Sequence, residues 1–496
     1  MLLSLGPSTR FGGAHNYTYQ MTKETKQNRH AADWIILTIA CVAQFMVVLD
    51  VSIVNVALPK MGADLHFTQS SAQWVVNAYV LTFAGFLLLG GRAADFFGRR
   101  HVYLTGLAVF TIASVGAGFA ATGSQMIAVR ALQGLGGAIL SPATLTIIVT
   151  TFQGPRLAKA IGAWSAVAGA GGAVGALAGG LLTGWASWRW VFFINVPFGL
   201  LAGVAALTYL REMRNKDATV KLDIFGSVLV TSGLAALIYG IVNTTTPGNS
   251  WTSQSTLGWV IGGVALLIAF LFWESKVASH PLVPFRIFKA RSLSTANVIM
   301  LLVGGAFFAM WYFLTYYFQE ILHFSVVRTG VAFVPMAVAI IIGAQVSSRL
   351  LGKTGARPIL LVGGSFATLG FYWLTLIQPT SHYFPSVIAP AVLCALAMGL
   401  LFAPLATAAT SGVDRADAGL ASGVLNTSRQ VGGSIGLAAL GTVATDRTIS
   451  AMHSVSPAQA YVDGYHSAFF ISALVGVVVT IIAFTLPAAT GKNAKH

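Results

Sequence analysis

The chain has 496 residues, of which 56% are hydrophobic and only 9% are charged. Soluble domains carry roughly 25% charged residues, so this composition excludes a soluble globular protein and predicts an integral membrane protein. The net charge of +15 is no sign of nucleic-acid binding, because the basic residues lie in short segments between apolar stretches. Cys41 and Cys394 both fall in apolar stretches, so we expect no disulfide, metal site or cofactor.

Apolar stretches long enough to cross a bilayer, which takes about 20 residues in a helix, occur fourteen times. A barrel would instead show alternating segments of about 10 residues, so the spanning elements are expected to be helices. The predicted fold is therefore all-α, with fourteen transmembrane helices. They are expected at about 34–57, 72–91, 101–121, 125–148, 158–182, 188–209, 224–243, 257–274, 294–319, 328–349, 357–377, 385–410, 418–443 and 465–487.

Lysine and arginine are concentrated in alternate connecting segments. With the N-terminus inside, 23 of the 29 basic residues fall in inner segments and 4 in outer loops, while Arg130 and Arg429 lie within helices. This asymmetry is a strong positive-inside signal and predicts that both termini are cytoplasmic. Met1 and Met21 are both possible starts of the natural chain.

A weak internal repeat suggests that the chain contains two similar halves. Leu-His-Phe-Thr at 65–68 recurs 257 residues later as Leu-His-Phe-Ser at 322–325, and Gly98 meets Gly355 at the same offset. Two halves related by an axis along the membrane normal are a transporter architecture. The expected division is an N-terminal tail (1–33), a six-helix bundle (34–210), two linker helices with their flanking loops (211–293), a second six-helix bundle (294–488) and a C-terminal tail (489–496).

A single carboxylate, Asp50, lies inside the first apolar stretch, and residues 34–59 contain no Lys, Arg or Glu. A charged Asp near a helix centre costs roughly 2.5–3.5 kcal/mol on insertion scales. Such a group is either hydrogen-bonded between helices for structure or is a protonatable group on a transport pathway. We favour the second interpretation and predict that Asp50 couples transport to protons, with Arg130 as the candidate cation beside it.

Two further stretches are each rich in one kind of residue, glycine in the first and aromatic residues in the second. Gly171, Gly175 and Gly179 recur every four residues, beside Gly180, and predict close contact with a neighbouring helix. An aromatic cluster in the ninth stretch is either an interfacial belt, the default interpretation, or part of a substrate cavity. The residues considered for such a cavity are Trp311, Tyr312, Tyr316, Asn426 and Gln430.

The loop after the second stretch, Gly91-Arg-Ala-Ala-Asp95-Phe-Phe-Gly98-Arg99-Arg100, resembles the signature loop of the major facilitator superfamily. Phe96 stands where that family usually has a basic residue. Residues 130–137 look like the family's buried-arginine motif, and residues 175–180 are similar to its antiporter motif, with Ala176 in place of the usual Pro. Residues 49–59, 188–190 and 195–197 resemble its fourteen-helix drug:proton antiporter branch.

The resemblance implies a carrier, not an enzyme, that exports hydrophobic, cationic small molecules from a bacterial cytoplasm in exchange for protons. Its partners would be the substrate, protons and membrane lipids, and it would act as a monomer in the cell membrane. The same fold could also transport a lipid, siderophore or nutrient. A redox protein is disfavoured because all ten histidines fall in tails, loops or helix ends. The implied inner gate, expected to contact residues 416–419, consists of Gly91, Asp95, Gly98, Arg99 and Arg100.

Overall fold

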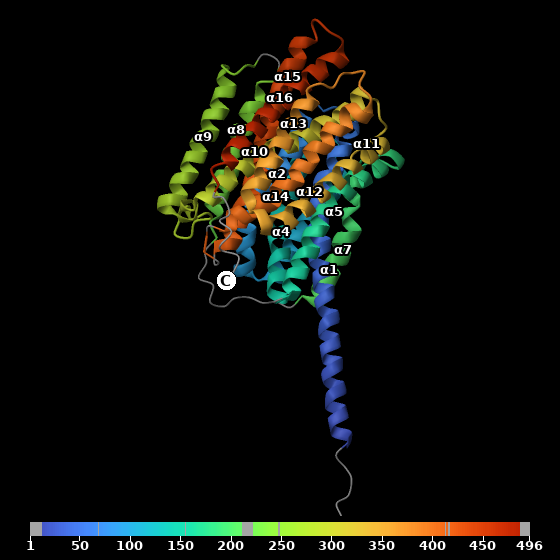
Figure 1. Cartoon of the computed structure of the whole chain (residues 1–496), viewed down its shortest axis with the longest axis vertical. Helices are drawn as coiled ribbons and strands as arrows, with labels where there is room; N and C mark the ends of the chain where they lie inside the picture. The colour runs from blue at the N-terminus through green and yellow to red at the C-terminus, as the bar shows by residue number, and fades with distance from the viewer. Residues whose placement is uncertain are drawn as a thin grey trace, which may run out of the picture.

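The computed structural model describes residues 12–67, 69–153, 155–210, 222–246, 249–411, 413–414 and 417–486. All regular structure within these ranges is helical, as the sequence predicts. The helices form one bundle, and the first of them projects far beyond it at the lower end of Figure 1.

The first half of the chain supplies seven helices. Their apolar side chains join a cluster of buried residues that extends into the second half, so the two halves share one continuous core. The helices are α1 (Gly12–Asp64), α2 (Gln69–Phe97), α3 (Arg99–Gly118), α4 (Gly123–Thr151), α5 (Pro155–Trp185), the short α6 (Trp190–Phe193) and α7 (Asn195–Tyr209).

Two helices follow that lie at the edge of the bundle, α8 (Ile224–Asn243) and α9 (Gln254–Phe272), as Figure 1 shows for α9. Helix α8 packs into the seam between the halves, where Leu234 and Ile238 meet Leu81 of α2 and Ala438 of α15 (Ala418–Ala451). Only 11% of the apolar window of α9 is buried, so this helix faces the lipid. Two short helices lead on to the second half, η1 (Trp273–Val277) and η2 (Phe285–Lys289).

The second half is also helical. It places its glycines at crossings between helices, as at Gly433 of α15, where an added methyl group would lie 3.4 Å from the Phe308 ring of α10. Its helices are α10 (Arg291–Tyr316), η3 (Tyr317–Ile321), α11 (Val326–Ala332), α12 (Val334–Thr354), α13 (Ala356–Leu374), η4 (Tyr383–Val387), α14 (Ile388–Ser411), α15 (Ala418–Ala451) and α16 (Pro457–Ala483).

Eleven helical segments among the described residues are long and apolar enough to cross a membrane. The other three expected spans lie in α5, α13 and α15, which are helical but are not among the eleven. The number of fourteen transmembrane helices, and with it the division into two six-helix halves and two linker helices, therefore stays a prediction.

The internal repeat is visible in the backbone. Among the described residues, the non-glycine positions with positive φ are His66 and His323, at 53° and 51°, and the glycines with positive φ are Gly98 and Gly355, at 90° and 76°. Each pair is separated by the 257 residues of the sequence repeat. Because a left-handed conformation is rare outside glycine, its recurrence at one offset shows that both halves turn in the same way.

The halves touch at the upper end of the bundle in Figure 1, opposite the projecting part of α1. There Gly180, near the end of α5, packs on Gly330 of α11, and a methyl group added at Gly180 would lie 3.2 Å from the Gly330 Cα. Nearby, Gln319 Nε2 donates a hydrogen bond of 2.9 Å to the Val56 carbonyl of α1. The positive-inside rule predicts that this end faces the outside.

Candidate functional site

The two charged groups singled out in the first half lie in contact. Arg130 Nη1 donates to Asp50 Oδ2, joining α4 to α1 in an ion pair, and both side chains are buried. Arg130 Nε also donates to the Val75 carbonyl of α2 at 3.2 Å. The charge of each group is thereby compensated, which a buried ion requires.

Three neutral side chains complete the network around Asp50. Gln133 Nε2 donates to Asp50 Oδ1 at 2.8 Å and lies 2.6 Å from Ser114 Oγ, while Gln133 Oε1 accepts from Arg130 Nη1 at 2.7 Å. Asn195 Nδ2 donates to Asp50 Oδ1 at 3.3 Å and to Ser114 Oγ at 3.1 Å. The carboxylate is thus held by one cation and two amides, and these contacts favour its anionic form against the cost of burial.

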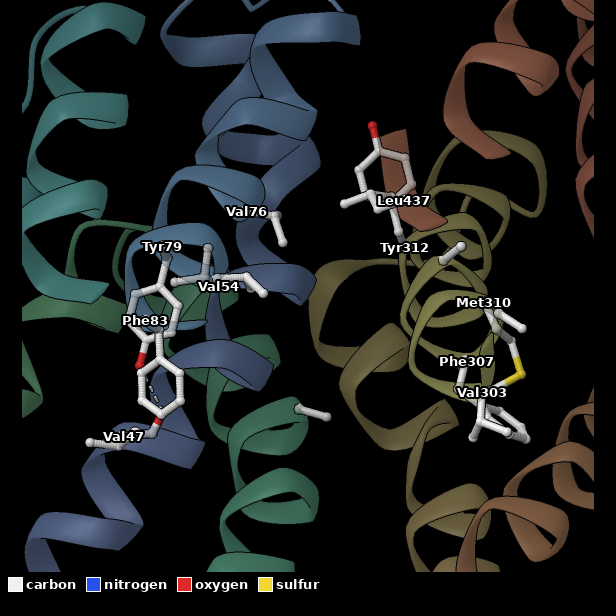
Figure 2. Packing of buried hydrophobic residues seen from close by; sticks show 14 of the residues in the cluster. Val47, Val54, Val76, Tyr79, Phe83, Val303, Phe307, Met310, Tyr312 and Leu437 are labelled. Carbon is white, nitrogen blue, oxygen red and sulfur yellow. Dashed lines mark hydrogen bonds between the residues drawn. The ribbon is translucent and has the colours of Figure 1, made fainter. Parts of the chain in front are cut away.

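Aromatic rings close the network. The Arg130 Cζ lies 4.3 Å from the centre of the Tyr79 ring, a cation–π contact. The Tyr79 hydroxyl donates to the Val47 carbonyl at 3.4 Å, the bond drawn as a dashed line in Figure 2. Tyr79 comes from α2, so the site is assembled from α1, α2, α3, α4 and the first residue of α7, all in the first half. Its polar members are fully enclosed by apolar packing.

One buried polar atom of the site has no partner in the described chain, namely Asn195 Oδ1. The amide nitrogen of the same side chain already donates to the Asp50 carboxylate. A rotation of this amide would present the oxygen in place of the nitrogen, and an oxygen can accept a hydrogen bond from a protonated carboxyl group. The site can therefore provide partners for both protonation states of Asp50.

Sequence reasoning identified the two charges but not most of their neutral partners. Gln133 falls in the quoted buried-arginine motif, three residues after Arg130 on the same face of α4. Asn195 also stood in a quoted motif, without a role. Ser114 and Tyr79 carry no sequence signal, because a serine or tyrosine in an apolar helix is unremarkable until its neighbours are known.

Arg100 and Gly98 of the expected inner gate have contacts or geometry that the structure describes. Arg100 Nη2 donates to the Leu207 carbonyl at 2.7 Å, in the last turn of α7, where a cation is favourable. Gly98 supplies a left-handed turn between α2 and α3. The Asp95 side chain and residue 416 lie outside the described residues, so their predicted contact stays a prediction. The start of α15 is instead tied by Asp417, whose carboxylate accepts from Arg286 at 3.1 Å.

The glycines of α5 serve two different contacts. A methyl group at Gly175 would lie 2.6 Å from the Ser52 Cβ, and one at Gly179 would lie 2.7 Å from the Ile53 carbonyl oxygen. Gly171 meets Val48. Because Val48, Ser52 and Ile53 all belong to α1, these three glycines bring α5 against α1 directly beside Asp50. Gly180 and Gly184, nearer the end of α5, instead face α11 of the second half.

The aromatic cluster lies in the core of the second half. Tyr312, Tyr317 and Phe318 are buried, so the interpretation as a lipid-facing belt is wrong for them. Figure 2 shows Tyr312 and Phe307 on α10, across from the group around Tyr79. Trp311 packs against Phe333, and Tyr316 packs against Tyr312. On α15, Gln430 is buried and Asn426 is partly exposed; their predicted role in a substrate cavity is not tested by these contacts.

The sequence matches the Major Facilitator Superfamily over residues 40–437. It is 41% identical over 455 residues to the cephamycin export protein CmcT of Amycolatopsis lactamdurans, covering 91% of this chain and 92% of that protein. It is 37% identical over 459 residues to the puromycin resistance protein pur8 of Streptomyces alboniger, covering 91% of this chain and 90% of that protein.

Solved structures show the same fold. A bacterial homologue of the human lysosomal transporter Spinster superposes with a TM-score of 0.63 at 16% identity, covering 91% of this chain and 96% of that one. A POT family transporter in complex with 5-aminolevulinic acid superposes with a TM-score of 0.60 at 13% identity, covering 90% and 95%. At these identities the likeness is one of fold alone.

Proposed function

The chain belongs to the major facilitator superfamily, and we propose that it exports hydrophobic small molecules in exchange for protons by alternating access. It is a multi-pass bacterial membrane protein and a transporter, not an enzyme. The names of its relatives, an export protein and an antibiotic resistance protein, support export over uptake. No described contact favours the alternative cargo, a lipid, siderophore or nutrient.

The observation that carries proton coupling is the enclosed pair of Asp50 and Arg130. A coupling carboxylate must be stable in both protonation states. Arg130, Gln133 and Asn195 stabilise the anion. The apolar surroundings and the unpartnered Asn195 Oδ1 favour the protonated, neutral form of Asp50.

Protonation of Asp50 would weaken its attraction for Arg130 and free the helices that the pair joins. Because α4 and α1 carry the two charges, the change reaches the face where α1 packs on the glycines of α5. An altered packing here would shift the equilibrium between the two conformations of the carrier. The contact of Gly180 with Gly330 would then open as the opposite end closes.

The proposal also covers the orientation in the membrane, the inner gate, the oligomeric state and the cargo. The end closed by α5 and α11 is the outer end of the carrier. The carrier lies in the cell membrane, and both of its termini lie in the cytoplasm. The gate loop at residues 91–100 moves against the start of α15 when the inner end closes. The carrier works as a monomer, and its cargo is hydrophobic; the cationic character of the cargo stays a prediction from the family resemblance.

Efflux from proteoliposomes tests the proposal, with the pH gradient and the membrane potential clamped separately by ionophores. The substitution Asp50→Asn keeps the shape and a hydrogen-bonding head but cannot release a proton. We expect it to bind cargo and to lose efflux driven by the pH gradient. Normal efflux by this variant would refute proton coupling through Asp50, and no gradient-driven efflux by the unaltered chain would refute the proposed function itself.

A further inference from the structure

The chain contains two arginines deep in its helices, and their surroundings differ. Arg130 is neutralised by Asp50. Arg429 of α15 donates through Nε and Nη2 to a single neutral oxygen, Asn426 Oδ1, at 3.2 and 2.9 Å. Among the side chains that the structure describes, no carboxylate lies within ion-pair distance of Arg429.

Arg429 lies far from either membrane surface. Its backbone packs on Gly304, where an added methyl group would lie 3.2 Å from the Arg429 Cα. Gly304 stands at the middle of α10, which begins at Arg291, about 20 Å away at ~1.5 Å per residue. The hydrocarbon core of a bilayer is roughly 30 Å thick, so a guanidinium at this depth is costly without a compensating anion.

The side chain lies on the inward side of its helix. Ser422, Asn426 and Arg429 follow one another at spacings of four and three residues, which places them on one face of α15. Ser422 is exposed, and the other two are partly exposed. On one flank of this face, Gly432 packs on Leu301 of α10; on the other flank, Gly423 lies beside Leu88 of α2. The face therefore points between the two halves, where a cargo would pass, and not into the lipid.

The chemistry of the group suits one kind of ligand. A guanidinium has more N–H donors than the two that Asn426 engages, and its planar fork matches a carboxylate in a bidentate pair. Asn426 fixes the plane of the guanidinium through its two bonds. The Phe402 ring of α14 lies 5.9 Å from the Arg429 Cζ and provides an apolar wall for the rest of a ligand.

We propose that Arg429, oriented by Asn426, binds an acidic group of the exported molecule, so that the carrier accepts acidic and zwitterionic cargo. This inference rests on the proposed export function and names the class of cargo. It assigns the two embedded arginines different tasks. Arg130 serves the proton site, and Arg429 serves the cargo.

Direct binding tests the proposal without any gradient, so the result does not depend on whether transport is proton-coupled. The purified full chain, in nanodiscs of neutral phosphatidylcholine, is titrated with two fluorescent probes by anisotropy. One probe is a rhodamine with a free carboxylate, the acid dye; the other is its methyl ester, the ester dye. We expect Arg429→Gln to weaken binding of the acid dye by roughly tenfold or more and to leave the ester dye unaffected.

Three further variants sharpen the result. Arg429→Lys keeps the charge without the planar fork, so it is expected to retain part of the preference for the acid dye. Asn426→Ala removes only the orienting amide and is expected to lower the preference by a smaller factor, which provides a test if Arg429→Gln fails to insert. Arg357→Gln removes a cation elsewhere in the second half, beside Phe484, and is the matched control with no expected effect.

The proposal would be overturned if Arg429→Gln and Asn426→Ala weakened binding of both dyes equally, or if they weakened binding of neither dye. A lipid headgroup could supply the same anionic chemistry, so the titration is repeated in nanodiscs that contain phosphatidylglycerol. Unchanged acid-dye binding there is the expected result. Its loss would assign Arg429 to lipid phosphate and would overturn the assignment to cargo.

Discussion

The contact between Gly180 and Gly330 offers a sharp test of how the outer end closes. A methyl group at Gly180 would lie 2.7 Å from the Val326 carbonyl oxygen and 3.2 Å from the Cα atoms of Val327 and Gly330. These are backbone atoms, which cannot move aside without separating α5 from α11. We therefore expect Gly180→Ala to destabilise the closed outer end while leaving each half intact.

The size of the effect follows from the geometry. Overpacking a tight contact costs typically 1–3 kcal/mol. If that cost applies only to the conformation in which the two helices touch, it shifts the population ratio by about 5- to 150-fold towards the conformation open at this end. Gly330→Ala is expected to act in the same direction, because its added methyl group would lie 2.6 Å from the Ala176 carbonyl oxygen.

Spin-label distances measure the shift, with labels at Ala186 and Thr380, which are exposed at the outer end of the two halves. The two natural cysteines, Cys41 and Cys394, are replaced in the background. Gly352→Ala in α12 is the matched control, because an added methyl group there meets nothing within 4 Å. A Gly180→Ala distance distribution identical to that of the unaltered chain, or an equal shift in the control, would refute this reasoning.

Three other substitutions probe the site and its frame. Arg130→Gln leaves Asp50 buried without its cation and should cost about 3–5 kcal/mol, seen as a lower melting temperature in detergent; the double variant with Asp50→Asn should recover much of the loss. Gly175→Leu should abolish transport without preventing membrane insertion, because the side chain meets Ser52; full transport would show that α5 need not approach α1. Gly98→Ala forces φ near 90° on a residue with a Cβ and should cost roughly 1–2 kcal/mol of thermal stability, whereas Gly352→Ala should cost none.

Sequence patterns predicted the parts of this molecule that depend on composition and missed those that depend on packing. Asp50 could be singled out because a carboxylate in a long apolar stretch is expensive. Asp50 and Arg130 are 80 residues apart in the sequence. Their contact depends on how α1 and α4 pack, which no local pattern encodes. The glycine spacing of α5 predicted a contact face, but period alone could not show that Gly175 faces α1 while Gly180 faces α11.

The duplication that is preserved in the backbone does not extend to Asp50. The 257-residue offset that pairs Gly98 with Gly355 places Phe307 at the position of Asp50, and Phe307 is buried among apolar neighbours. At this offset Asp50, the proposed coupling carboxylate, therefore has an apolar residue as its counterpart. One titrating group predicts one proton per transported molecule. With a monocation this exchange is electroneutral and draws only on the pH gradient, about 1.36 kcal/mol per unit. With a zwitterion bound at Arg429 the same proton carries a net charge inward, so the membrane potential adds about 2.3 kcal/mol per 100 mV.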